Sequence, residues 1–562
     1  MNASGQRVAL LTFTSYLFVA SFHRLLSSVV QYADAAVIVK SPVGKILGVK
    51  RSAFGDKDVY AFTGIRYAKP PIGALRYRKP QPEPPWGDDV WDATRTPPSC
   101  LQHSVFSPRD LIWIPYDVQT SEDCLYLNIW SPSLNATAKR PVMAWIHGGQ
   151  FIHGSAATPL VDGGNLAALG DVVVVTIAYR LQSFGYLYDG TENAPGNQGL
   201  HDQLLALKWI RENIAAFGGD PSEVTLFGFS AGGMSIGFFL TAPSARALFK
   251  RAIIHSGPVA RNGLTKDKGA ALIESFKFAK IFGCNNESSE AHMAGSFASC
   301  MRNVNASLIS VLEQNFMNDG GKFMPIFGDH LLPTDPQVAN FTGDRDVMIG
   351  YVASEGSVNL YVRFTDVFSK TLPPRNVSKV EMLYYLGALH KGLSISEVLT
   401  LRELYMRKIA DVDYDKLRRA LAEEQSDVLI NCASVDTALK LAKAATSAKA
   451  NNAVYLYKMN HVSRCTKVQP WLGMTHGDDT PFVFGRPLDE NGCGGDIPFA
   501  KKVIEIWSNF AYGRVPKGPA GVKWPKFKTH YPALLEITNA KFFVSKINYF
   551  ARCKKLKKLR LY

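Results

Sequence analysis

The sequence predicts an α/β protein in which helices cover a mostly parallel central sheet. Three observations lead to this prediction. Between residues 140 and 260, strand-like segments alternate with a long helical segment. The strand-like segments are apolar throughout, as expected of strands buried on both faces. The stretch from about 265 to 450 has a mostly helical pattern, which indicates insertions that pack over the sheet.

The individual segments follow one another in the order strand, helix, strand. Residues 141–147 and 171–179 are apolar and rich in β-branched side chains, which is typical of strands. A helix is predicted over residues 199–219, because leucine, tryptophan and isoleucine recur there at helical spacing and glycines end the segment. Further strands are expected at 223–228, 251–257, 346–352 and 453–461. This rhythm predicts parallel strands joined by helical crossovers.

The N-terminus resembles a targeting segment. Arg7 precedes an apolar stretch at 8–22, which is too short to cross a bilayer comfortably. Small residues at 33–35 offer a cleavage site. We therefore expect a cleaved signal peptide over residues 1–35, in preference to an uncleaved anchor. The remaining residues, 36–562, contain no repeat and no Gly/Ser linker, so we expect one secreted domain.

Glycosylation sequons and cysteines agree with export. Downstream of the apolar stretch, five asparagines stand in Asn-X-Ser/Thr tripeptides and mark exposed loops if they are used: Asn135, Asn286, Asn305, Asn340 and Asn376. The chain has eight cysteines, the even number that a disulfide-bonded protein needs. Eight cysteines allow 105 pairings, so their number alone does not give the connectivity.

The formal net charge of the chain is +15. Six lysines and arginines fall in residues 552–562, and this basic C-terminal tail could hold the protein weakly on anionic glycans or membrane surfaces. The pattern favours a solvated, frayed end over such a binding segment. We expect no nucleic-acid partner.

Ser230 stands in the pattern Gly-X-Ser-X-Gly between a predicted strand and a predicted helix. A turn this tight brings backbone close to the serine, and glycines at 228 and 232 relieve the clash. The serine hydroxyl then projects from the carboxyl end of the sheet. The amide of Ala231 lies at a helix N-terminus, where an anion is stabilised. The arrangement predicts a nucleophilic serine, with a packing turn as the alternative.

A nucleophilic serine needs a base, an acid that orients the base, and donors for an oxyanion. Gly148 and Gly149 follow the strand at 141–147, and their amides can point at an oxyanion together with that of Ala231. Glu355, just past the strand at 346–352, is the candidate acid. His476, between glycines in a later loop, is the candidate base. The chain order serine, acid, histidine is typical of this architecture.

These motifs together resemble the type-B carboxylesterase/cholinesterase family of α/β-hydrolases over roughly residues 36–553. The segments that carry the resemblance are SEDCLYLNIW, HGGQF, GNQGLHDQ, AAFGGDPSEVTLFGFSAGG, SEGS and THGDDTPFVFG. The resemblance implies an α/β-hydrolase fold with helical insertions that form a gorge. It also implies an esterase with Ser230, Glu355 and His476 as its triad, and no metal or organic cofactor.

The resemblance implies disulfides and ion pairs as well. Family pairs match Cys100 with Cys124, Cys284 with Cys300, and Cys432 with Cys553. Cys465 and Cys493 remain and flank His476, so we predict a fourth bridge that braces this loop. Family ion pairs correspond to Arg76 with Glu122 and to Arg180 with Asp202.

Substrate preference depends on residues near the serine. Cholinesterases carry a glutamate where this chain has Phe229, and usually an aromatic residue where it has Val358. Trp113 resembles their choline-stacking tryptophan, although its spacing to the next cysteine is one residue longer. We expect a gorge for neutral esters, with an acetylcholinesterase-like enzyme as the alternative and a non-catalytic adhesion protein as the third possibility. Residues 540–559 form an amphipathic segment that could support a homodimer.

Overall fold

The computed structural model describes residues 35–102, 119–284, 297–365, 367–448, 452–465, 468–489, 492–516, 521–539, 541–547 and 550–562. Trp113 and Asn286 and the expected signal peptide lie outside these residues, apart from Ala35. Among the described residues, no helix has both the length and the apolar character to span a membrane.

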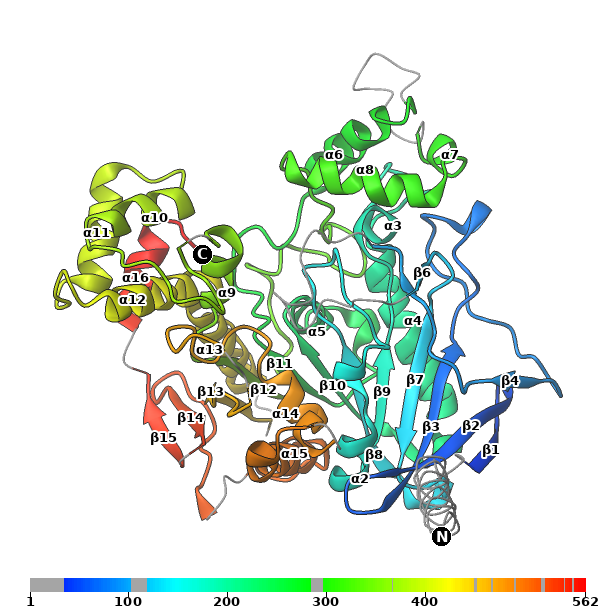
Figure 1. The fold of residues 1–562 in the computed structure, drawn as a ribbon. Helices are drawn as coiled ribbons and strands as arrows, with labels where there is room; N and C mark the ends of the chain where they lie inside the picture. The colour runs from blue at the N-terminus through cyan, green and yellow to red at the C-terminus, as the bar shows by residue number, and fades with distance from the viewer. Residues whose placement is uncertain are drawn as a thin grey trace, which may run out of the picture.

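A thirteen-stranded sheet runs through the molecule (Figure 1). Its strands, in spatial order, are β1 (Ala35–Ser41), β2 (Gly44–Ala53), β3 (Lys57–Arg66), β7 (Tyr126–Ser131), β9 (Val173–Ile177), β8 (Arg140–Ile146), β10 (Gly219–Phe229), β11 (Arg251–His255), β12 (Asp346–Val352), β13 (Val454–Asn460), β14 (Ala533–Thr538) and β15 (Phe542–Lys546), with β4 (Val90–Asp92) paired to β2. From β9 to β14 every pairing is parallel, and the strands outside that run pair antiparallel, except that β4 lies parallel to β2. A separate pair joins β5 (Ser99–Cys100) to β6 (Thr120–Ser121).

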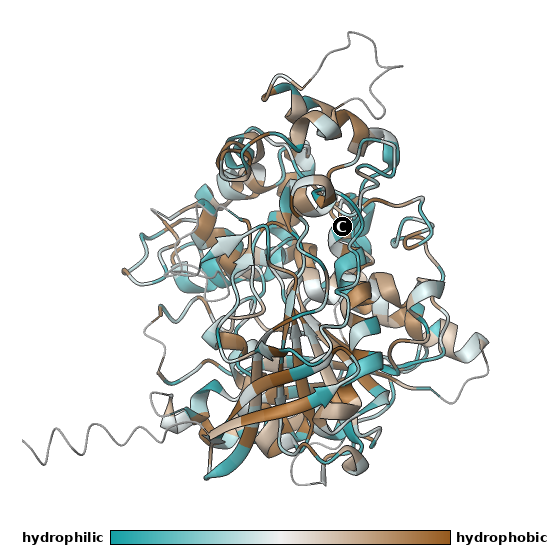
Figure 2. Ribbon diagram, turned by 90° about the vertical axis from the view of Figure 1, so that its right-hand side faces the viewer, coloured by the Kyte–Doolittle hydropathy of each residue, from teal (hydrophilic) through white to brown (hydrophobic). Residues whose placement is uncertain are grey.

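Helices cover both faces of the sheet because its central strands are apolar on both sides. On β8, Val142, Ala144 and Ile146 join one hydrophobic cluster, whereas Met143 and Trp145 join a second one on the opposite face. The first cluster includes residues of α4 (Gln198–Asn213), α5 (Ala231–Phe239) and α13 (Cys432–Ser447). The second includes α2 (Gly164–Gly170), α14 (Thr480–Phe484) and α15 (Ile497–Ala511). Figure 2 shows hydrophobic residues along these strands.

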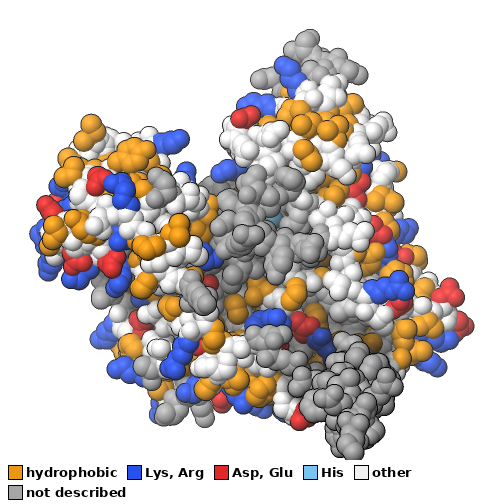
Figure 3. All heavy atoms as spheres, in the orientation of Figure 1, with side chains coloured by type: hydrophobic (Ala, Val, Ile, Leu, Met, Phe, Trp, Pro, Cys, Tyr) orange, Lys and Arg blue, Asp and Glu red, His pale blue; other side chains and the backbone are white. Residues whose placement is uncertain are grey.

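Two helical lobes rise on either side of the carboxyl ends of the parallel strands (Figure 1). One lobe contains α6 (Lys268–Lys280), α7 (Ala298–Met301) and α8 (Ala306–Asn318). The other contains α9 (Ser357–Arg363), α10 (Glu381–Leu389), α11 (Ile395–Met406) and α12 (Tyr414–Ser426), which a short π-helix (Asp427–Asn431) joins to α13. Figure 3 shows the surface hollowed between the lobes. The largely helical stretch expected at 265–450 corresponds to these insertions.

The C-terminal segment differs from the prediction of a frayed tail. Residues 540–559 divide into the end strand β15 and the helix α16 (Phe550–Lys558). Cys553 and Leu556 are buried, and Tyr562 is only 4% exposed, so the tail packs against the body of the protein. The run of positive charge in the sequence obscured these three widely spaced contacts.

Candidate active site

Ser230 lies at the turn between β10 and α5, as its motif predicts. Its backbone is strained, with φ 53° and ψ −120°. The glycine two positions later is required for packing, because a Cβ on Gly232 would lie 1.9 Å from the carbonyl oxygen of Ile146. The turn can therefore form only against the end of β8, and it presents the serine at the carboxyl edge of the sheet.

The structure brings Ser230, His476 and Glu355 into one hydrogen-bonded chain. Ser230 Oγ lies 3.0 Å from His476 Nε2, and His476 Nδ1 lies 2.5 Å from Glu355 Oε2. Because the carboxylate accepts from Nδ1–H, Nε2 is left as the acceptor for the serine proton. The imidazole is 14% exposed and the carboxylate is fully buried, so the base reaches solvent and the acid does not.

Ser256 is a further residue of the site that sequence reasoning missed. It follows β11, and its hydroxyl donates to Glu355 Oε1 at 2.5 Å. The amide of Val352 donates to the same oxygen at 2.8 Å. Two donors on one carboxylate oxygen turn the other oxygen toward His476. The one sequence signal was the polar His-Ser-Gly end of an otherwise apolar strand.

A buried aromatic–acid cluster ties the site to the second face of the sheet. His255 Nδ1 lies 3.0 Å from Asp479 Oδ2, and Trp507 Nε1–H donates to His255 Nε2 at 3.1 Å. Since the indole can only donate, Nε2 is unprotonated and Nδ1 carries the hydrogen toward Asp479. The carbonyl of His255 also accepts the Ser230 amide at 2.8 Å. This residue thus links the nucleophile turn to the segment three residues beyond His476.

Three backbone amides near Ser230 are suited to an oxyanion. Within the described part of the chain, the N–H groups of Gly148, Gly149 and Ala231 form no hydrogen bond with a protein acceptor. Gly149 has φ +107°, and a Cβ there would lie 1.9 Å from the carbonyl oxygen of His153. Ala231 is the first residue of α5, so its free amide is a normal feature of a helix start. These three donors can stabilise negative charge on a bound oxygen.

The residues expected to shape substrate preference are only partly brought together. Phe229 packs its ring 4.6 Å from the imidazole of His476, measured between ring centroids. Val358 is half-buried on α9 and packs against a third hydrophobic cluster in the second lobe. Phe229 therefore places an apolar wall directly beside the candidate base.

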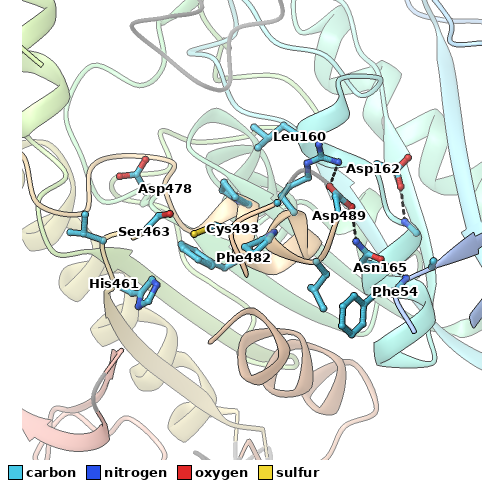
Figure 4. A pocket seen from close by; sticks show the side chains of 18 of the residues that line it. Phe54, Leu160, Asp162, Asn165, His461, Ser463, Asp478, Phe482, Asp489 and Cys493 are labelled. Carbon is cyan, nitrogen blue, oxygen red and sulfur yellow. Dashed lines mark hydrogen bonds and ion pairs between the residues drawn. The ribbon is translucent and has the colours of Figure 1, made fainter. Parts of the chain in front are cut away.

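A cavity of about 950 Å³ borders the turn that carries His476 (Figure 4). Thr475 and Asp478 line it, whereas Ser230 is not among the described lining residues. Asp478 Oδ2 accepts the Thr475 amide at 2.8 Å and so closes the turn. Desolvation raises the pKa of the Asp478 carboxyl to about 7, against the opposing effect of Lys370.

The cysteines pair as the resemblance implies, and the fourth bridge forms as well. The four pairs are Cys100–Cys124, Cys284–Cys300, Cys432–Cys553 and Cys465–Cys493.

Both ion pairs implied by the resemblance are present, since Arg76 binds Glu122 at 2.6 and 2.7 Å and Arg180 binds Asp202 at 2.7 and 2.8 Å. The four sequons in the described residues have exposed asparagines, namely Asn135, Asn305, Asn340 and Asn376. Among the described residues, no group of three or more His, Cys, Asp or Glu side chains is placed to hold a metal ion.

A mostly parallel sheet with a serine at a strand-to-helix turn, followed along the chain by an acid and then a histidine, defines an α/β-hydrolase. Comparison with known proteins gives the family. The model of the carboxylesterase family matches residues 35–555. Acetylcholinesterase-1 of Trittame loki is 32% identical over 514 residues, which cover 88% of this chain and 89% of the relative. Acetylcholinesterase of Bungarus fasciatus is 32% identical over 525 residues, covering 89% and 82%. The chain belongs to the carboxylesterase family.

Proposed function

We propose that the protein is a secreted serine carboxylesterase that hydrolyses neutral esters through an acyl-enzyme on Ser230. The observation that carries this proposal is the contact chain from Ser230 Oγ through His476 to Glu355. A serine hydroxyl is a weak nucleophile until a base removes its proton, and His476 Nε2 lies at hydrogen-bond distance from that proton.

The reaction follows from the positions of these groups. Ser230 Oγ attacks the ester carbonyl as His476 accepts its proton, and the oxyanion is held by the amides of Gly148, Gly149 and Ala231. The imidazolium gives the proton to the leaving alcohol, while Glu355 stabilises its charge. Water then attacks the acyl group in the same way, releasing the acid and restoring Ser230. The sequence needs no metal or organic cofactor.

The preference for neutral esters rests on Phe229. A quaternary ammonium is attracted by a nearby carboxylate or by the face of an aromatic ring. At 4.6 Å from the imidazole, Phe229 supplies no negative charge at the position where cholinesterases carry a glutamate. The second candidate function is a choline esterase, which is favoured by the two relatives named acetylcholinesterase.

The nucleophile is tested with a chromogenic ester. We expect Ser230→Ala to abolish hydrolysis of p-nitrophenyl butyrate, whereas Ser235→Ala, at the next serine in α5, should retain it. A Ser230→Ala protein that still turned over the ester would disprove the assignment. Covalent labelling of the unmodified chain by an organophosphate tests the adhesion-protein alternative, because an adhesion protein without a working triad should stay unlabelled.

Substrate charge is tested by comparing acetylthiocholine with its uncharged isostere, 3,3-dimethylbutyl thioacetate. We expect kcat/KM to be no higher for the cation. Phe229→Glu should shift the ratio toward the cation, and Phe229→Gln, a neutral residue of similar size, should not. A strong preference of the unmodified protein for acetylthiocholine would establish the choline-esterase alternative instead.

Export, domain organisation and assembly complete the proposal. The four disulfides support residence in an oxidising compartment, with residues 1–35 removed as a signal peptide and residues 36–562 forming one domain. Sugar attachment at the exposed sequons follows from export. A homodimer through the C-terminal segment would use α16 alone, since β15 belongs to the sheet. Sequencing of the secreted N-terminus and light scattering test these points.

A further inference from the structure

Positive charge is concentrated at the C-terminal end of the chain. Of the last 42 residues, eleven are lysine or arginine and only Glu536 is acidic. This segment forms the end of the sheet, β14 and β15, and the helix α16. Its charge therefore gathers on one side of the fold instead of spreading over the surface.

The helix α16 is held rigidly with its lysines outward. Cys553 is disulfide-bonded to Cys432, and Leu556 is fully buried. Arg552 binds Asp427 and Glu423 at 2.5 and 2.8 Å, and Lys557 binds Asp436 at 2.7 Å. The exposed lysines at 554, 555 and 558 have no ion-pair partner among the described residues. Their charge is available to an external anion.

The positive charge continues from α16 across the end of the sheet. A recess of about 680 Å³ is lined by Arg552 of α16, Lys546 of β15, Lys458 of β13 and Arg419 of α12. Beyond the recess, Lys546 Nζ lies 5.2 Å from the ring of Tyr531, next to a shallow pocket lined by lysines 526 and 528. We call this set of residues, together with lysines 554, 555 and 558, the C-terminal basic surface.

Protection of the sheet edge and membrane attachment each account for less of this surface. Lysines on an end strand discourage edge-to-edge pairing, which explains Lys541 and Lys546 of the β15 region but not the charges of α16. A membrane-binding helix needs an apolar face turned outward. In α16 that face is already used, because Cys553 and Leu556 point into the protein.

We propose that the C-terminal basic surface binds an extended sulfated polysaccharide. Such a polymer carries closely spaced negative charges along a flexible chain, which matches cations presented in succession by α16, β15 and the loop before β14. Binding of this kind is electrostatic, so it weakens as salt screens the charges. The proposal is independent of ester hydrolysis.

Retention on immobilised heparin tests the proposal with the full secreted chain. The test variant is Lys554→Glu, Lys555→Glu and Lys558→Glu combined. The control variant carries the same charge change at lysines 40, 139 and 208, which are exposed on or near β1, β8 and α4. Thermal midpoints of both variants verify that they are folded.

We expect the unmodified protein and the control to bind heparin in 0.15 M NaCl, and the test variant to bind about tenfold or more weakly, since each lysine near an anionic surface contributes about 1 kcal/mol. A heparin dodecasaccharide should compete better than a disaccharide, because only the longer chain reaches across several elements. Equal weakening in the control would show nonspecific attraction by net charge. Co-sedimentation with phosphatidylserine vesicles without heparin binding would identify a membrane surface instead. Either result would overturn the proposal.

Discussion

Glu313 provides a sharp test of how burial sets the stability of the first lobe. This carboxyl of α8 is fully buried beneath the lobe. Ser183 N–H donates to Oε1 at 2.7 Å, and Ser183 Oγ lies 2.6 Å from Oε2. Burial raises the pKa of Glu313 from 4.5 to about 8, and the contacts with Ser183 only partly oppose the shift.

The raised pKa gives stability a defined dependence on pH. Below pH 4.5 the native and unfolded states both hold the proton, and the stabilising effect of the native site is complete. Between pH 4.5 and 8 the unfolded state loses the proton first, so stability falls by about 1.4 kcal/mol per pH unit. At pH 7 the accumulated loss is about 3 kcal/mol.

The variant Glu313→Gln removes this dependence and keeps the contacts. Its amide oxygen can accept from Ser183 N–H, and its amide nitrogen can donate to Ser183 Oγ, as the protonated carboxyl does. With an unfolding entropy of about 2.1 cal/mol/K per residue, 3 kcal/mol corresponds to about 3 °C in a chain of this size. We therefore expect the variant to melt about 3 °C above the unmodified protein at pH 7 and at the same temperature at pH 4.5.

Differential scanning calorimetry from pH 4.5 to 8, at one scan rate, measures this difference. Glu212→Gln, on the exposed side of α4, is the matched control and should show no pH-dependent difference. A Glu313→Gln difference that stayed constant across the range would refute the reasoning, because it would mean that Glu313 does not hold a proton in the native state.

Three further predictions concern the residues around the site. Ser256→Ala removes a donor to Glu355, and because a hydrogen bond to a charged group is worth about 1.5–3 kcal/mol, kcat should fall about tenfold to a hundredfold with KM unchanged; an unaltered kcat would show that the Val352 amide orients Glu355 alone. His255→Phe leaves the buried Asp479 carboxylate without its partner and should lower the free energy of unfolding by about 3–5 kcal/mol in a denaturant titration. Adding Asp479→Asn should recover part of that loss, and no recovery would contradict the assigned pair. Replacing Cys465 and Cys493 by serine opens a loop with a sequence separation of 28 and should cost about 3–4 kcal/mol, with a lower kcat because His476 lies within the loop. A variant with unchanged stability and kcat would show that the bridge does not brace the base.

The sequence predicts the central strands and the three linked side chains well, because both depend on local patterns. β8 to β13 are continuous apolar segments, and Ser230 and the glycines near it form a turn whose chemistry is contained in a few residues. The antiparallel strands β1 to β3 and the pair β14–β15 were not predicted. They lie toward the ends of the sheet, and their burial patterns are mixed.

Residues whose role depends on distant contacts were also missed. Ser256 meets Glu355 across 99 positions of sequence, and His255 meets Asp479 across 224. Neither pairing has a local signature. The tail was expected to fray because its lysines dominate the composition, while the contacts of Cys553, Leu556 and Tyr562 with the body of the protein depend on the folded structure.

The bridge between Cys432 and Cys553 spans 121 positions and encloses His476. A protease that cut the backbone once between these cysteines would leave both pieces covalently attached, so the nicked protein would migrate at full mass until a reductant was added. Secreted preparations that look intact on a non-reducing gel can therefore contain two-chain molecules, and only reduction before electrophoresis counts them.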